Sequence, residues 1–104
     1  MQSDDENMTV VGIKHDTGKP DYSRIPAVAL LDIVRVFDYG AGKYGANNWH
    51  GLEPKRLYSA IMRHLEAWRM GSMLDDESGQ QHLAHAAASA MMLLHIERQN
   101  HVAE

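Results

Sequence analysis

The sequence predicts an all-α fold: three main helices with an extended N-terminal arm, in a helical bundle completed by oligomerisation. Apolar residues recur at helical spacing in three segments, each segment opens on a proline or serine suited to a first turn, and glycines separate the segments. A chain of 104 residues is long enough for one domain. We expect a flexible N-terminus over residues 1–11 and a single domain over residues 12–104.

The arm precedes the first helix. Glycines and prolines punctuate residues 9–26, so we expect an extended segment with at most a short strand at Val10–Ile13. Such an arm typically wraps over a partner surface or closes a site. The first helix is expected from Pro26 to about Tyr39, ending at Gly40 or Gly42. Its apolar face is so wide that it implies contacts on more than one side.

A glycine-rich loop is expected over residues 40–53. Lys43 and Asn48 are polar residues on a loop beside a packed scaffold, and we expect them to contact a ligand. The ring of Trp49 is more simply interpreted as a plug that packs under the loop, although Tyr44 or Trp49 can also stack on a base.

The second helix is expected from Pro54 to about Met70, where Gly71 ends it. Its buried stripe consists of four residues at helical spacing: Leu57, Ile61, Leu65 and Trp68. His64 lies on or beside this stripe, whereas Glu66 points elsewhere.

The third helix is expected from about Ser78 to about Gln99. Ser78 and Gln81 have the spacing of a capping box, in which two side chains satisfy two free N–H groups reciprocally. The first half of this helix is rich in alanine, which allows another backbone to approach closely.

Composition excludes several classes of protein. The chain has no cysteine, which rules out disulfides and thiolate metal sites. A formal charge of −4 argues against a nucleic-acid polymer as partner. No apolar run has the length of a membrane span, so we expect no membrane and a cytoplasmic location. The sequence also lacks the motifs of P-loop, Rossmann and α/β-hydrolase proteins.

The hairpin between the second and third helices concentrates metal-binding side chains. His82 and His85 stand one turn apart on one helix face, directly after an acidic loop and opposite His64. Taken singly, each is more often a hydrogen-bonded structural histidine than a ligand. Together with Asp75 and Glu77 they fit a divalent ion such as Mn²⁺, Fe²⁺, Co²⁺ or Zn²⁺, whereas Mg²⁺ prefers oxygen ligands. Asp76 and four other histidines are interpreted as surface residues: His15, His50, His95 and His101.

Four cations are candidates for holding phosphate. Lys14 and Lys19 lie in the arm, Lys43 in the glycine loop and Arg63 in the second helix. Ordinary surface charge is the alternative, but glycine-rich backbone is suited to grasping a phosphate group.

Four successive motifs carry a resemblance: KHDTGKPDYSRIP, DYGAGKYGANNW, RLYSAIMRHLEAW and LDDESGQQHLAHAA. Over about residues 12–97 the chain resembles the largely phage-encoded family named dATP/dGTP diphosphohydrolase, N-terminal domain. The residues that match the family are Lys14, Asp16, Gly18, Lys19, Pro20, Tyr39, Gly40, Lys43, Tyr44, Asn48, Trp49, Arg63, His64, Trp68, Asp75, Glu77, Ser78, Gly79, His82 and His85. The resemblance implies cleavage of a purine deoxynucleoside triphosphate, as in MazG-like all-α pyrophosphohydrolases. The E-E-x-x-E and E-x-x-D motifs of those enzymes are absent from this sequence.

The first hypothesis is therefore a metal-dependent pyrophosphohydrolase that cleaves dGTP or dATP to the monophosphate and pyrophosphate in the (host) cytoplasm. The ion is Mn²⁺, Mg²⁺, Co²⁺ or Zn²⁺. The expected catalytic and metal-binding residues are His64, Asp75, Glu77, His82 and His85. The expected substrate-binding residues are Lys14, Lys19, Lys43, Tyr44, Asn48, Trp49 and Arg63. The second hypothesis is a non-catalytic module that sequesters a nucleotide or cyclic nucleotide, and the third is a purely structural oligomer whose histidines are buried hydrogen-bonding residues. Whatever its function, we expect the chain to form a homodimer or a dimer of dimers that completes a four-helix core.

Overall fold

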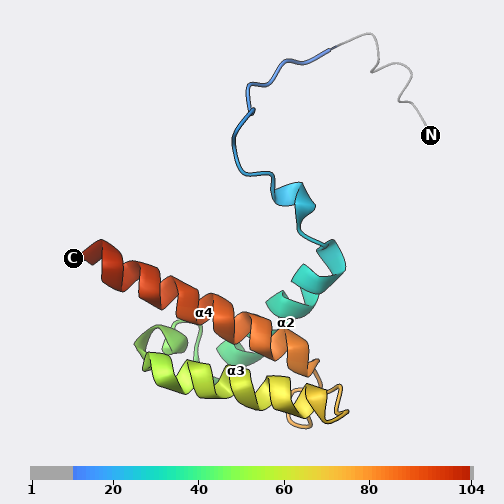
Figure 1. The fold of residues 1–104 in the computed structure, drawn as a ribbon, viewed down its shortest axis with the longest axis vertical. Coiled ribbons are helices and arrows are strands. Elements are labelled where there is room, and N and C mark those ends of the chain that lie inside the picture. The colour runs from blue at the N-terminus through green and yellow to red at the C-terminus, as the bar shows by residue number, and fades with distance from the viewer. Residues whose placement is uncertain (1–10, 104) are drawn as a thin grey trace.

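A computed structural model describes residues 11–103 of the chain. It contains helices α2 (Ala27–Tyr44), α3 (Pro54–Arg69) and α4 (His82–Ala103), with two short 3₁₀ turns, η1 (Tyr22–Arg24) and η2 (Asn48–Gly51) (Figure 1). No strand occurs among these residues, which confirms the all-α prediction. Of the segment expected to be extended with at most a short strand at Val10–Ile13, residues 11–13 form no strand. Val10 lies outside the described residues, as does most of the N-terminus expected to be flexible. None of the described helices combines the length and hydropathy that a membrane crossing requires.

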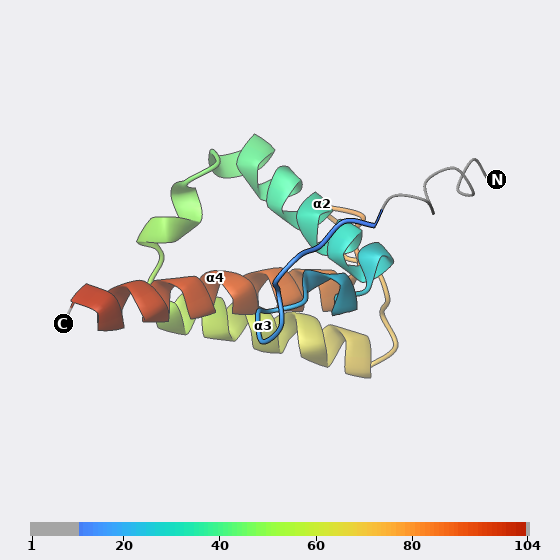
Figure 2. The ribbon, with the colours of Figure 1, turned by 90° about the horizontal axis from the view of Figure 1, so that it is seen from above.

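Helices α3 and α4 lie side by side, and α2 crosses α4 (Figures 1 and 2). The contact is close because small side chains face it: Ala84, Ala86 and Ala88 are buried, Ala88 completely. Leu57 of α3 is also buried, whereas Val36 of α2 packs onto Ala84 and Ala88. The alanine-rich half of α4 therefore serves as a slim surface for the helices of its own chain.

Helix α2 ends later than the sequence predicts. It continues through Gly40 and Gly42 to Tyr44, and it stops at Gly45, whose φ of 96° is accessible only to glycine. A glycine inside a helix costs only about 1 kcal/mol, which tertiary packing can offset. Lys43 and Tyr44, expected on a loop, consequently project from the last turn of a helix.

Helix α4 begins later than predicted, and the expected capping box is wrong. The side chain of Asp75 accepts a hydrogen bond from the N–H of Ser78 (2.9 Å), and Ser78 Oγ accepts one from the N–H of Gln80 (3.1 Å). An antiparallel bridge between Leu74 and Gln81 closes the turn. These local bonds compete with helix formation, so the helix begins only at His82.

The buried stripe of α3 is only partly as predicted. Leu57 is buried and Ile61 and Leu65 are half-buried, but Trp68 is 51 % exposed. Because α4 starts at His82, the last turn of α3 has only the connecting loop beside it. Trp68 thus borders a shallow surface hollow with Met73.

Candidate functional site

A cavity of about 610 Å³ lies between the C-terminal half of α2, the segment that follows it, α3 and α4. Its polar lining residues are Tyr39, Lys43, Tyr44, Asn48, Arg56, Arg63, His64, Asp75, Glu77, His85 and Ser89. Its apolar and aromatic lining includes Val36, Phe37, Trp49, Leu52, Leu57 and Met92. The volume is in the range of small-molecule sites, about 300–1,000 Å³. One cavity therefore brings together residues from four segments that are distant in sequence.

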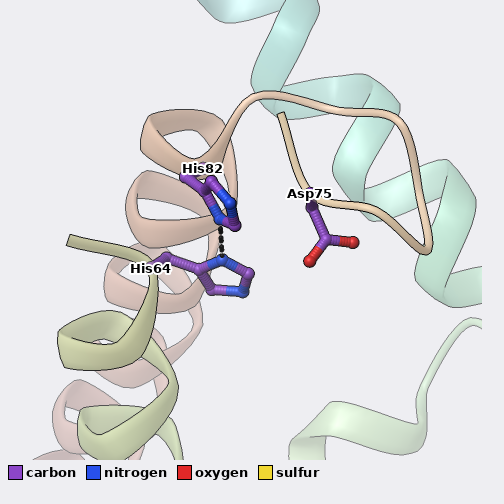
Figure 3. Close-up of side chains that lie close together, drawn as sticks. All are labelled: His64, Asp75 and His82. Carbon is purple, nitrogen blue, oxygen red and sulfur yellow. Dashed lines mark hydrogen bonds between the residues drawn. The ribbon is translucent and has the colours of Figure 1, made fainter. Parts of the chain in front are cut away.

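Three imidazoles and a carboxylate gather beside this cavity, and all of them except His82 line it. His64 comes from α3, His82 from the start of α4 and Asp75 from the turn between the helices (Figure 3). His85 follows His82 on α4 by one turn. The Nδ1 atoms of His64 and His82 are 2.9 Å apart. The His64 ring stacks on that of His85 with 4.4 Å between centroids, and His85 Nε2 is 3.9 Å from Asp75 Oδ2. The sequence prediction that these four side chains share one site is consistent with this arrangement.

Two serines orient the histidines. Ser72 Oγ donates to the carbonyl of Leu74 (3.4 Å) and lies 3.1 Å from His82 Nε2, so the imidazole N–H on Nε2 can donate to it. In this tautomer, Nδ1 of His82 carries no hydrogen, and its lone pair faces Nδ1 of His64. Ser78 Oγ contacts His85 Nε2 at 2.6 Å. Such outer contacts fix the ring orientation of metal-binding histidines.

Burial favours the neutral form of two of these imidazoles, those of His64 and His85. Desolvation, together with the neighbouring His85 and His82, lowers the pKa of His64 to about 4. Desolvation also lowers the pKa of His85 below its ordinary value. Burial opposes ionisation of Asp75, but hydrogen bonds from Ser78 and the nearby histidines outweigh it and lower its pKa. At neutral pH, His64 and His85 therefore offer neutral imidazole nitrogens beside the ionised Asp75, which is the protonation state that metal binding requires.

Three of these side chains meet the geometric requirement for one ion. His64, Asp75 and His82 each place one ligand atom within 4.8 Å of the other two (Figure 3). Two nitrogen donors and one oxygen donor suit Zn²⁺, Mn²⁺, Co²⁺ or Fe²⁺ better than Mg²⁺. Figure 3 shows the carboxylate and the two rings converging from separate segments. His85 adjoins this group, whereas Glu77 does not belong to it.

Glu77 turns away from the three possible ligands and contacts α2, although its partner Tyr39 also lies in edge contact with His85, with 6.3 Å between ring centroids. It accepts a hydrogen bond from the Tyr39 hydroxyl (2.6 Å) and forms an ion pair with Lys43. The hydrogen bond from Lys43, followed by that from Tyr39, lowers the pKa of Glu77, and the same bond raises the pKa of Lys43 well above its usual range. All three side chains are exposed or half-exposed, so water and salt screen this charge cluster.

The predicted substrate-binding residues divide into two groups. Lys43, Tyr44, Asn48, Trp49 and Arg63 all line the cavity. Lys14 and Lys19 lie on the exposed arm and do not line the cavity. The ring of Trp49 is half-buried, in edge contact with Phe37 and stacked on His50, which agrees with a packing role and leaves one side on the cavity.

Sequence reasoning missed two contributors. Arg56 lines the cavity with Arg63, and their seven-residue spacing on a helix, which places both on one face, was the available signal. Ser72 had no such signal, because its contact with His82 depends on how the loop closes.

Comparison with known proteins agrees with the resemblance seen in the motifs. A family model described as "dATP/dGTP diphosphohydrolase, N-terminal" matches residues 10–104. A protein of Salmonella phage PMBT28 named dATP/dGTP diphosphohydrolase is 39 % identical over 84 residues, which make up 81 % of this chain and 29 % of that protein. The chain thus spans less than a third of this relative's length, and no solved structure matches it significantly. The chain belongs to the dATP/dGTP diphosphohydrolase N-terminal family.

Proposed function

We propose that this chain is a metal-dependent diphosphohydrolase that cleaves dGTP or dATP to the monophosphate and pyrophosphate. One observation carries the proposal: the same cavity is lined by His64 and Asp75 of the possible metal triad and by the cations Lys43, Arg56 and Arg63. A nucleoside triphosphate is a ligand that uses both kinds of residue. The relative's name supports the choice of a purine deoxynucleotide, and such a substrate implies the cytoplasm as the place of reaction.

The cavity's two ends suit the two ends of a nucleotide. Phe37, Trp49 and Met92 provide an apolar and aromatic wall on which a base can stack, and Asn48 offers a donor and an acceptor for its edge. Lys43, Arg56 and Arg63 would offset the charge of the phosphates. Because Lys43 is already paired with Glu77, a phosphate oxygen must share or displace that carboxylate.

The reaction adds water to the α-phosphorus and breaks its bond to the bridging oxygen, so that pyrophosphate leaves. A divalent ion held by His64, Asp75 and His82 would polarise the phosphoryl group and lower the pKa of a bound water. His85 is neutral, borders the cavity and lies beside Asp75, so it is placed to accept the proton of the attacking water. Its contact with Ser78 would hold the ring in position.

Turnover of a nucleotide panel tests the proposal. We expect wild-type protein with Mn²⁺, Co²⁺, Zn²⁺ or Mg²⁺ to release pyrophosphate from dGTP or dATP, resolved by ion-exchange chromatography, and removal of the ion with a chelator to stop it. Arg63→Ala should raise KM, while Lys55→Ala, an exposed cation on the same helix that does not line the cavity, should leave it unchanged. Tight nucleotide binding with no pyrophosphate under any ion would contradict the enzyme and support the sequestering module.

A homo-oligomer is part of the proposal. Several large apolar side chains of α2 are exposed, among them Val28, Leu31 and Val34, and the alanine-rich face of α4 is already used within the chain. We expect sedimentation at micromolar concentration to show a dimer or larger species, and a stable monomer would contradict this.

A further inference from the structure

The arm, residues 11–26, carries apolar side chains that its own chain does not cover. Every residue of the arm is exposed, and Val11, Ile13 and Tyr22 are 83–84 % exposed. Figure 1 shows the arm leading away from the three helices. A segment that presents large apolar side chains in this way gains stability only when another surface buries them.

Local bonds direct the arm away from its own cavity. The N–H and Oγ of Ser23 both donate to Asp21 Oδ1 (3.0 and 2.5 Å), and the N–H of Ile25 donates to the carbonyl of Tyr22 (3.2 Å). Pro26 restricts Ile25 to extended backbone, observed with ψ of 128°. These bonds hold residues 21–25 in a turn, from which the arm leads away from the helices (Figure 1).

The arm continues into an apolar face of α2. On one side of α2, Val36 packs in the core with Ile33 and Phe37. On the other side, Val28 is 76 % exposed and Leu31 and Val34 are each more than 40 % exposed. These residues, together with Ile25 of the arm, form one uncovered surface, which we call the α2–arm surface.

We propose that the α2–arm surface binds a second copy of this chain, and that the arm of each copy lies over the cavity of the other and brings Lys14 and Lys19 to it. A two-fold axis through the N-terminal half of α2 pairs the helices antiparallel. The arm of one copy then runs toward the C-terminal half of the partner's α2, whose segment from residue 39 to 44 lines the partner's cavity.

The distances permit this exchange. Lys19 precedes Pro26 by seven positions, and because Tyr22–Arg24 form the 3₁₀ turn η1, this segment spans at most about 19 Å. Helix α2 has 18 residues and is about 27 Å long. In an antiparallel pair of α2 helices, the arm of one copy is therefore long enough to place Lys19 near the partner's Lys43.

The role of the two lysines rests on the proposed nucleotide substrate, whereas the docking of the arm does not. A nucleoside triphosphate carries several negative charges, and of the three cations that line the cavity Lys43 is already paired with Glu77, which leaves Arg56 and Arg63. Lys14 and Lys19 would supply further cations from the partner, so that the site is complete only in the dimer.

Photo-cross-linking tests the docking without nucleotide or turnover. The chain has no cysteine, so Thr17→Cys at the exposed tip of the arm can be labelled selectively with a maleimide benzophenone. Labelled ¹⁴N protein is mixed with unmodified ¹⁵N protein, equilibrated, irradiated and digested for mass spectrometry. Gln99→Cys, at the exposed far end of α4, is the matched control.

We expect mixed-isotope cross-links from position 17 to peptides containing residues 36–49, and none of these from position 99. Cross-links from position 17 to that region within one isotope only would show an arm closing over its own cavity, and would overturn the proposal. Cross-links elsewhere, or none, would overturn it as well.

A second measurement isolates the role of the lysines. Lys14→Ala/Lys19→Ala should weaken dGTP binding about tenfold without dissociating the dimer, and Lys55→Ala should not. Unchanged affinity together with mixed-isotope cross-links would remove the lysines from the site and leave the exchanged arm. Failure of wild-type protein to bind or cleave dGTP would refute the proposed function, while the cross-links would still decide the docking.

Discussion

The two walls of the cavity are built by different forces. One wall consists of His64, Asp75 and His85, with His82 beside them outside the lining. This cluster is partly buried, burial favours the neutral form of His64 and His85, and two serines contact the rings of His82 and His85. The wall formed by Tyr39, Lys43 and Glu77 is more open and is held together by charge. Burial and packing pre-organise the first wall, whereas the second can rearrange when an anion arrives. The difference teaches which changes should abolish function and which should only tune it.

The largest effect is expected from removing a side chain of the buried wall. If His64 holds the ion, His64→Ala should lower metal-dependent turnover by at least about 100-fold, because loss of an outer-shell contact alone typically costs 10–100-fold. The helix should survive, since alanine is the best helix former. Turnover, metal titration and melting temperature are measured on the same variant.

Lys55→Ala is the control for this comparison. A His64→Ala protein that melts early yet binds metal and turns over normally per folded molecule would make His64 a structural histidine.

The next effect concerns stability against pH. The folded state keeps the pKa of His64 at about 4, below the ordinary value of 6.5, so the unfolded state binds the proton more readily. The stability that comes from burying His64 as neutral imidazole is therefore fully present above pH 6.5 and is lost progressively as the pH falls toward 4. The resulting loss in the free energy of unfolding is at most about 3 kcal/mol, because each unit of difference in pKa corresponds to about 1.4 kcal/mol.

Urea unfolding at several pH values measures this dependence. Wild-type protein should lose stability between pH 6.5 and 4, and His64→Ala should lose less over the same interval. If the free energy of unfolding depended equally on pH in the two proteins, His64 would not be buried as a neutral imidazole.

A smaller effect is expected from changing Ser72, which contacts the imidazole of His82 and not the proposed ion. Ser72→Ala removes the acceptor for His82 Nε2 and should lower metal affinity about 10-fold with the fold intact. Ser59→Ala, an exposed serine of α3 outside the cavity lining, is the control. Metal affinity unchanged in Ser72→Ala would contradict the assigned orientation of the His82 ring.

The smallest effect belongs to the exposed wall. Glu77→Gln should free Lys43 and tighten dGTP binding a few-fold, with a steeper dependence on salt, because exposed ion pairs are weak and screened. Binding isotherms at low and high salt measure both changes. A loss of metal affinity in Glu77→Gln would instead support the original prediction that Glu77 is a ligand.

Sequence patterns predicted those parts of the fold that depend on local signals. Pro54 and Gly71 bracket α3, and the structure ends this helix within one residue of the expected Met70. The end of α2 was missed because Gly40 and Gly42 are tolerated inside a packed helix. The start of α4 was missed because the Asp75 side chain binds the backbone at Ser78, a competition that a capping pattern does not reveal.

The candidate site was predictable as a set of residues but not as a geometry. The spacing of His82 and His85 and their position opposite His64 followed from helical periodicity. That His82 rather than His85 faces His64 Nδ1, and that Glu77 turns toward Lys43, depends on the register of the turn from residue 74 to 81. The way in which this turn closes against the helices cannot be predicted from the local sequence pattern.

The central claim is that both walls act on one ligand, and the coupling between metal and nucleotide tests it most directly. Calorimetric titration with a non-hydrolysable dGTP analogue, with and without Zn²⁺ or Mn²⁺, measures that coupling, which must be reciprocal. We predict that the ion tightens nucleotide binding at least about tenfold in wild-type protein and has no such effect in His64→Ala. Equal nucleotide affinity with and without bound ion in wild-type protein would show two independent sites and contradict the account.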